Sequence, residues 1–172
     1  MGIPSYAHED AMIFHLDHKE QWEPVVRQWR NEGQTIVTTN GTFDIIHVGH
    51  VKLLREARAQ GDKLVLGLNS DISVKQYKSV NRPIVPQEER AAMLEAIRYV
   101  DLILIFDEPE SLRFVREVRP DVHVKDSSYG YNLIEAPIVQ EYGGRIHLVE
   151  KTGHSTTNII EKVLEVYRKE GG

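Results

Sequence analysis

The sequence predicts an α/β protein with a doubly wound, five-stranded parallel sheet and an added N-terminal helix. Short apolar runs alternate along the chain with amphipathic stretches of helical period, which is typical of this class. Two of the runs, 63–69 and 101–106, are almost continuously apolar, as in strands that are buried on both faces of a parallel sheet. A chain of 172 residues fits one ordinary domain of this kind.

The N-terminal part is expected to contain an arm and one helix. Residues 1–16 show no clear period, whereas 17–30 carry an apolar stripe. The stripe has the spacing i, i+3, i+4 and i+7 and consists of Trp22, Val25, Val26 and Trp29. Pro24 marks either the true start of this helix or a kink in it. With Gly33 as the stop, we expect 1–33 to form the arm and helix and 34–172 the main domain.

Five strands rich in Val, Ile and Leu are expected next: 35–39, 63–69, 101–106, 121–125 and 145–149. The helices expected between and after them are 49–60, 86–98, 109–118, 132–142 and 155–169. Pro86 has the chemistry of a helix start, and Gly61 that of a helix end. The longest stretch without periodicity is 70–85, a cationic segment, and long loops in compact domains are often functional.

Composition excludes several classes of protein. Cysteine is absent, which removes disulfides, Cys-ligated zinc, iron–sulfur clusters and thiol nucleophiles. Lys and Arg number 21 against 26 Asp and Glu, and the net charge of −5 disfavours a non-specific nucleic-acid binder. No run approaches the roughly 18 apolar residues of a membrane span, and no signal peptide is recognisable. We therefore expect a cytoplasmic protein without nucleic-acid or membrane partners.

The segment richest in chemistry follows the first strand of the main domain. Residues 40–50 read Asn-Gly-Thr-Phe-Asp-Ile-Ile-His-Val-Gly-His and run into a helix. Ligands of open α/β sheets bind beyond the carboxyl ends of the strands, where this segment is expected to lie. His47 and His50 stand at a helix start, whose unpaired N–H groups and dipole favour phosphate. Gly49 allows close approach of the backbone, so the pattern indicates a phosphate site.

Two other interpretations of this histidine pair remain open: structural histidines, or a pair of zinc ligands. The lack of cysteine weakens the zinc interpretation, although carboxylates could complete a site. The turn is not a P-loop, because no Gly-Lys-Ser/Thr follows, nor is it a Gly-x-Gly-x-x-Gly dinucleotide turn. No metal-ligating residue of the chain itself is predicted.

Residues 41–44, Gly-Thr-Phe-Asp, followed by His-Val-Gly-His at 47–50, resemble the signature of the cytidylyltransferase-like nucleotidyltransferases, the HxGH superfamily. Three further segments, 67–71, 82–90 and 155–160, are similar in order and spacing to the D-glycero-β-D-manno-heptose 1-phosphate adenylyltransferases. Many bacteria carry that domain fused behind a sugar kinase, and this chain resembles a stand-alone form. The resemblance covers about residues 35–165 and implies a Rossmann-like nucleotidyltransferase fold.

The resemblance implies a reaction in which ATP and a sugar 1-phosphate give an ADP-sugar and pyrophosphate, with Mg²⁺. It implies catalytic roles for His47, His50 and Lys78. The residues implied in nucleotide binding are Gly41, Thr42, Phe43, Asp44, Gly49, Lys52, Ser155, Thr156 and Thr157. Those implied in acceptor binding are Asn69, Asp71, Arg90, Lys125 and Tyr129. The Trp22 and Trp29 stripe is expected to pack on the domain or on a second subunit, which makes a homodimer a candidate assembly.

One segment departs from the heptose family, which commonly has Val-Lys-Gly-Gly-Asp-Tyr after the fourth strand. Here 124–129 reads Val-Lys-Asp-Ser-Ser-Tyr. His154 is left open as a ligand contact or a surface residue.

Three other functions stay open. Residues 52–54 and 98–101 resemble glycerol-3-phosphate cytidylyltransferases, and 83–90 resembles archaeal FMN adenylyltransferases. The third is a non-catalytic nucleotide-binding module, which the intact His-x-Gly-His disfavours. The 155–160 segment favours the sugar-phosphate enzyme.

Overall fold

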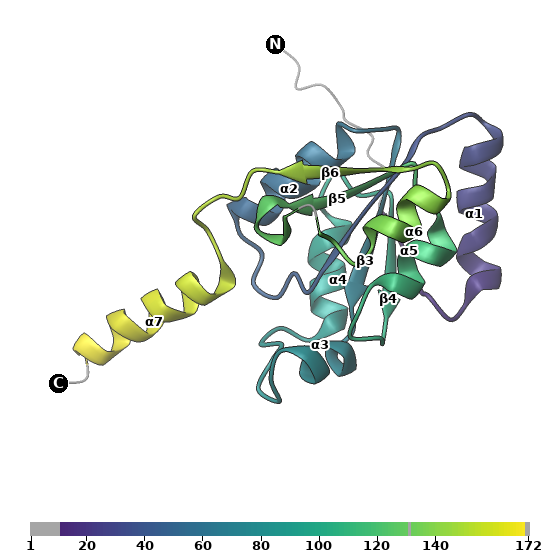
Figure 1. The fold of residues 1–172 in the computed structure, drawn as a ribbon. Coiled ribbons are helices and arrows are strands. Elements are labelled where there is room, and N and C mark those ends of the chain that lie inside the picture. Colours follow the sequence, from purple (N-terminus) through teal and green to yellow (C-terminus); the bar gives the residue numbers. More distant parts are fainter. Residues whose placement is uncertain (1–10, 131, 171–172) are drawn as a thin grey trace, which may run out of the picture.

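A computed structural model describes residues 11–130 and 132–170. It contains a six-stranded sheet in the order β1-β4-β3-β2-β5-β6 (Figure 1). The strands are β1 Met12–His15, β2 Ile36–Gly41, β3 Lys63–Asn69, β4 Leu102–Phe106, β5 Val122–Asp126 and β6 Arg145–Val149. All five pairings between neighbouring strands are parallel. The doubly wound α/β class is therefore confirmed, whereas the predicted number of five strands is wrong.

The additional strand is β1, which lies within the segment expected to be an arm. It forms the edge of the sheet and pairs with β4 in parallel, with Met12 opposite Leu102 and His15 opposite Ile105. Its four residues are too few for a period to emerge, and all are only partly buried. The signal that could have revealed it is the apolar run Ala11–Phe14, followed by the fully buried Leu16.

The helices are α1 Lys19–Asn31, α2 Val48–Arg58, α3 Asp71–Tyr77, α4 Gln87–Glu95, α5 Leu112–Val118, α6 Ala136–Glu141 and α7 Thr156–Glu170. A single 3-10 turn, Ser127–Tyr129, follows β5. Helix α3 corrects the expectation of a loop over 70–85. It begins where the Ser70 hydroxyl accepts a hydrogen bond from the Ser73 N–H at 3.1 Å. With seven residues and only Ser73 and Val74 buried, it is too short to show an amphipathic pattern.

Helix α1 confirms the apolar stripe but shows Pro24 inside the helix rather than at its start. Trp22, Val26 and Trp29 are buried in the core cluster that also contains Leu16. The stripe thus packs on the domain of its own chain, so a homodimer would need another surface.

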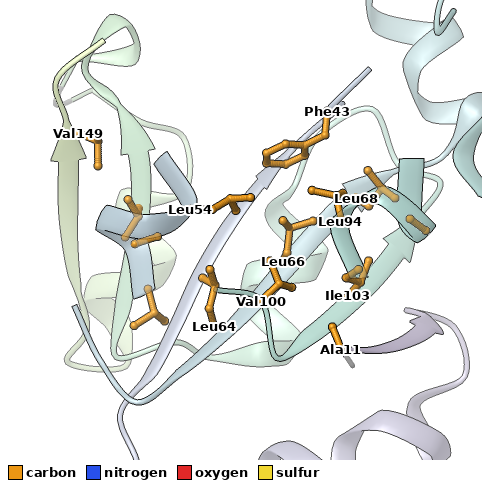
Figure 2. Packing of buried hydrophobic residues seen from close by; sticks show 14 of the residues in the cluster. Ala11, Phe43, Leu54, Leu64, Leu66, Leu68, Leu94, Val100, Ile103 and Val149 are labelled. Atoms are coloured by element: carbon orange, nitrogen blue, oxygen red, sulfur yellow. The ribbon is translucent and has the colours of Figure 1, made fainter. Parts of the chain in front are cut away.

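The core lies in two layers, one on each face of the sheet. Successive residues of β3 alternate between them, with Leu64, Leu66 and Leu68 on one face and Val65 on the other. Leu54 of α2 and Leu94 of α4 cover the first face (Figure 2). The other face is covered from α1, α5 and α6 by Trp22, Phe114 and Ile138 among others. This double burial explains why the β3 sequence is continuously apolar.

The strand order reverses direction between β2 and β5. The chain proceeds from β2 outward to β3 and β4, and then returns to the other side of β2 with β5 and β6. The loops that leave β2 and β5 therefore diverge, and such a switch point is where open α/β sheets bind ligands. Helix α7 extends from this region away from the sheet (Figure 1). In the described part of the chain, no helix has both the length and the apolar character needed to cross a membrane.

Candidate active site

Two adjoining cavities lie at the carboxyl ends of β2 and β5. The larger cavity has a volume of about 420 Å³ and is bounded by the start of α2, the 3-10 turn and the connection from β6 to α7. The smaller cavity, of about 170 Å³, is bounded by the loop after β2, the end of α3 and the end of β5. The residues that line both cavities are His50, Leu53, Lys78, Asp126, Tyr129 and Thr156.

All but three of the predicted site residues line these cavities. His47, Gly49, Lys52, Ser155 and Thr157 line the larger cavity. Gly41, Thr42, Phe43, Asp44 and Lys125 line the smaller cavity. His50, Lys78, Tyr129 and Thr156 line both. The exceptions, Asn69, Asp71 and Arg90, line neither cavity.

The two histidines form one stacked pair. His47 is the N-cap of α2, and its Nδ1 accepts a hydrogen bond from the Gly49 N–H at 3.1 Å. The His47 and His50 rings stack with their centroids 3.8 Å apart, and the Phe43 ring lies 5.0 Å from that of His50. A Cβ atom on Gly49 would lie 2.7 Å from Thr152 Oγ1 and 3.0 Å from the His47 ring, so a larger residue would displace these side chains. Because Nδ1 of His47 is an acceptor, the neutral ring carries its proton on Nε2.

Burial keeps this pair uncharged at neutral pH. It lowers the pKa of His50 to about 4, and the neighbouring His47 and Lys78 act in the same direction. Burial also lowers the pKa of His47, with a contribution from the charge of His154. The Nδ1 atom of His50 is buried and has no hydrogen-bond partner among the described residues. The pair therefore offers hydrogen bonds rather than positive charge to a ligand.

Positive charge comes from the surrounding wall of the larger cavity. Four cationic side chains line it, namely Lys52, Lys78, Arg82 and Lys151, against two carboxylates, Asp126 and Glu150. Burial lowers the pKa of Lys78, and the charge of Arg82 acts in the same direction. Arg82 is paired with Asp44 at 2.7 Å and Lys52 lies 3.7 Å from Glu56, so part of this charge is balanced within the protein. Lys78 and Lys151 are the further cations that an anionic ligand would meet, even though the whole chain carries −5.

Helix α7 also begins at the larger cavity. The Ser155 hydroxyl accepts a hydrogen bond from the Asn158 N–H at 3.1 Å and so caps the helix. Thr156 Oγ1 donates to the Ile45 carbonyl oxygen at 3.4 Å, which ties α7 to the loop after β2. The cavity therefore meets the N-terminal ends of both α2 and α7, where backbone N–H groups and the helix dipoles favour anions.

Asp44 fixes the segment that leads into α4. Its buried carboxylate accepts hydrogen bonds from the Arg82 guanidinium at 2.7 Å and from the N–H groups of Ile84 and Val85 at 2.9 Å. Phe43, which precedes it, has a φ of 48°, a left-handed conformation that turns the chain sharply after β2. Asp44 thus orients Arg82 and the chain that leads into α4.

Arg90 belongs to a buried network behind the wall. Its side chain is fully buried and donates hydrogen bonds to carbonyl oxygens of Thr42, Asn69 and Val85. A fourth bond reaches the carboxylate of Asp71 at 2.7 Å. We call these five residues the Arg90 network. It holds together the ends of β2 and β3 and the start of α4, and every guanidinium nitrogen is engaged within the protein.

Lys125 lines the smaller cavity and is paired with Glu135, a buried residue that was not predicted. Its Nζ lies 3.2 Å from Glu135 Oε1, and both side chains are buried. Glu135 also accepts a hydrogen bond from the Ser111 hydroxyl. Burial lowers the pKa of Lys125, whereas the charge of Glu135 opposes that shift. No sequence pattern marks Glu135 as buried.

Other wall residues that were not predicted include Asn40, Tyr77 and Arg82. Asn40 directly precedes the Gly-Thr-Phe-Asp motif, which could have drawn attention to it. The Tyr77 hydroxyl shares a hydrogen bond with that of Thr42. His154, left open from the sequence, lines the larger cavity.

No group of three or more His, Asp or Glu side chains in the described ranges could hold a metal ion. Mg²⁺ at nucleotide sites is usually bound by one or two carboxylates together with substrate phosphates. Asp126 and Glu150 on the wall of the larger cavity fit that arrangement, and a dedicated protein cage is not required.

Comparison with protein families matches residues 38–162 to the cytidylyltransferase-like family. The curated relatives include the bifunctional protein HldE of Syntrophotalea carbinolica, 43% identical over 153 residues, which are 88% of this chain and 31% of that protein. HldE of Geobacter sulfurreducens is 45% identical over 163 residues, or 94% of this chain and 33% of the relative. The chain thus spans about a third of the length of the curated relatives it matches.

Solved structures with the same fold include a lipopolysaccharide core biosynthesis protein from Thermoplasma volcanium. It is 26% identical, with a TM-score of 0.57 over 72% of this chain and 100% of that one. Pantoate–β-alanine ligase from Francisella tularensis has a TM-score of 0.63 at 13% identity, covering 84% of this chain and 68% of the ligase. At that identity the second likeness concerns the fold alone.

Proposed function

This chain belongs to the cytidylyltransferase-like family, and from that membership we propose that it is a nucleotidyltransferase that moves AMP from ATP to a sugar 1-phosphate. The proposed acceptor is D-glycero-D-manno-heptose 1-phosphate, and the products are the ADP-sugar, a lipopolysaccharide precursor, and pyrophosphate. The observation that carries the proposal is the stacked, uncharged His47–His50 pair at the start of α2, facing a cationic cavity.

The reaction needs little covalent chemistry from the protein. An oxygen of the acceptor phosphate attacks the α-phosphorus of ATP in line, the bond from that phosphorus to the bridging oxygen breaks, and pyrophosphate leaves. Catalysis then consists of positioning and stabilising charge on the phosphoryl oxygens. His47 donates from Nε2, and His50 supplies the second imidazole; each donor is worth on the order of 10²–10³ in rate.

The cations of the wall complement this pair. Lys78 lines both cavities, and the transferred phosphoryl group is placed beside it in this proposal; Arg82 lines the larger cavity only. Lys52 donates to the Glu150 carbonyl oxygen at 3.0 Å, which keeps its charge beside the larger cavity. Mg²⁺ bound with ATP would neutralise part of the polyphosphate charge, and Glu150, which lines the larger cavity alone, is the carboxylate that would hold it.

The choice of a heptose phosphate rests on the 67–71, 82–90 and 155–160 segments and on the HldE relatives. The similarity to the Thermoplasma volcanium protein, which is named for lipopolysaccharide core biosynthesis, agrees with it. The relatives are about three times as long as this chain, so only the part that they share with it supports the proposal.

A matrix of substrates tests the proposal. Pyrophosphate release is measured with ATP, CTP, GTP and UTP against heptose 1-phosphate, glycerol 3-phosphate and FMN. We expect the highest kcat/KM with ATP and heptose 1-phosphate. A higher value for CTP with glycerol 3-phosphate, or for ATP with FMN, refutes the acceptor assignment but not nucleotidyl transfer. Nucleotide binding without pyrophosphate release for any pair would make the chain a binding module.

A further inference from the structure

The smaller cavity contains a polar group that the protein leaves unsatisfied. Asn40 is at the carboxyl end of β2 and lines this cavity. Its Oδ1 atom is buried and has no hydrogen-bond partner among the described residues. A buried oxygen without a donor is unfavourable, and native proteins seldom keep one without a functional reason. A ligand hydroxyl that reaches Asn40 would supply the missing donor.

The rest of the wall of the smaller cavity offers both hydrogen-bond donors and hydrogen-bond acceptors to the hydroxyl groups of a ligand. The Lys125 ammonium group is a donor that Glu135 holds in place at 3.2 Å. The Asp126 carboxylate is an acceptor, and its Oδ1 is oriented by the Ser128 N–H at 2.9 Å. A sugar hydroxyl both donates and accepts, so a wall that mixes fixed donors and acceptors suits several hydroxyls at once. The rings of Phe43 and Tyr129 provide apolar surface beside these groups.

The size and position of the smaller cavity also favour a sugar as its ligand. At about 170 Å³ the cavity is smaller than the roughly 300 Å³ at which pockets for drug-sized ligands begin, and it matches one sugar better than a flavin. It meets the larger cavity at His50 and Lys78. A sugar held there would present its phosphate to the imidazole pair. Of the five residues predicted to bind the acceptor, Lys125 and Tyr129 line this cavity. Asn69, Asp71 and Arg90 belong to the Arg90 network.

Resting on the proposed function, we propose that the smaller cavity binds the polyhydroxyl body of the acceptor and that Asn40 determines specificity by accepting a hydrogen bond from one of its hydroxyls. Lys125, positioned by Glu135, is the neighbouring donor. A site built around such groups rejects a smaller analogue, because buried polar atoms are then left unpaired.

The first experiment compares Asn40→Ala with the wild-type protein in steady-state kinetics. We expect KM for heptose 1-phosphate to rise about tenfold or more, since a hydrogen bond to the acceptor is lost, while KM for ATP changes less than about twofold. The preference for heptose 1-phosphate over glycerol 3-phosphate should fall accordingly. Asn40→Ser keeps a shorter hydrogen-bond acceptor, so its KM for heptose 1-phosphate should lie between those of the wild type and Asn40→Ala. It also provides a second variant if the alanine protein does not fold.

Gln34 provides a matched control. It precedes β2 at the opposite end of the strand, and its Oε1 is also a buried amide oxygen without a partner among the described residues. Gln34→Ala removes a comparable group outside both cavities and should leave both KM values unchanged. Equal effects of the two substitutions would show that the loss is structural and would overturn the assignment.

A binding measurement separates this inference from the proposed reaction. Heptose 1-phosphate is titrated calorimetrically into protein that is saturated with α,β-methylene-ATP, which does not transfer AMP. Weaker binding to Asn40→Ala than to the wild type supports the subsite, even if no ADP-sugar forms and the proposed reaction fails. Equal affinity of the two proteins, or no binding to either, refutes the subsite, even where transfer proceeds.

Discussion

The β3 side and the α2 side of the candidate active site use charged and polar residues in opposite ways. On the β3 side, all three nitrogens of the Arg90 guanidinium donate to oxygens of the protein. On the α2 side, His50 keeps a buried ring nitrogen without a partner among the described residues. Groups that are satisfied internally build the site, whereas groups left unsatisfied on the cavity wall are available to a ligand. Substitutions on the two sides should therefore affect different quantities.

The largest expected effect is on stability and lies on the β3 side. Arg90→Met removes a fully buried guanidinium and leaves three carbonyl oxygens and the Asp71 carboxylate without their donor. Asp71 is partly exposed, but each carbonyl oxygen left without its donor costs about 1–3 kcal/mol, so we expect the free energy of unfolding to fall by about 3 kcal/mol or more. Urea denaturation measures the loss, and Arg27→Met, at an exposed position of α1, should change stability by less than about 0.5 kcal/mol.

The Arg90 variant also tests the prediction, made from the sequence, that Arg90 binds the phosphorylated acceptor. If Arg90→Met unfolds like the wild type but binds the acceptor poorly, Arg90 contacts the anion directly and the comparison between the two sides fails.

The next effect is on turnover and lies on the α2 side. His50→Ala removes one imidazole of the stacked pair, and we expect kcat to fall at least about a hundredfold with a smaller change in KM for ATP. Its stability should change much less than that of Arg90→Met. Initial rates of pyrophosphate release measure the effect, with His18→Ala at the exposed start of α1 as the control. Turnover near the wild-type value in His50→Ala would exclude the proposed mechanism.

The same contrast explains what the sequence could and could not reveal. Strands β3 and β6 coincide with the predicted 63–69 and 145–149. In β3 the apolar signal is strong because the strand is buried on both faces, whereas β6 is an edge strand in which only Val149 is buried. The imidazole pair follows from a motif at a helix start, a local feature. Arg90 shows a charge in the sequence but not its four acceptors, which only the folded chain brings around it. Glu135 is invisible for the same reason, since only tertiary contacts make it buried.

A smaller expected effect is the change of folding stability with pH, which follows from the burial of His50 on the α2 side. The pKa of His50 is about 4 in the folded protein, against 6.5 for an ordinary histidine. The unfolded chain therefore binds protons more readily, and stability present above pH 6.5 is lost as the pH falls towards 4. At pH 5 this amounts to about 1–2 kcal/mol for His50, from 1.36 kcal/mol per pKa unit.

His50→Gln isolates this contribution. Urea denaturation at pH 7 and pH 5 should show a larger acid-induced loss in the wild type than in the variant. Burial also lowers the pKa of His123, which bonds to Thr38 beneath the site, but its contribution is the same in both proteins and cancels in the difference. Identical losses in both proteins would mean that His50 is not desolvated, and the uncharged imidazole pair would have to be abandoned.

The smallest expected effect sharpens the comparison within one loop, the connection between α3 and α4. At the end next to α4, called here the far end, the backbone N–H groups of Ile84 and Val85 have a hydrogen-bond partner, because they donate to Asp44. Its near end holds Lys78 on the cavity wall and Val80 with 81% of its surface exposed. ATP should order the near end, since its phosphates give Lys78 a partner, and leave the far end as it is. Amide hydrogen exchange should therefore slow around Val80 on adding ATP while Ile84 and Val85 stay equally protected. Unchanged exchange at Val80, or ATP-dependent protection spread evenly over the loop, would show that the nucleotide does not distinguish its two ends.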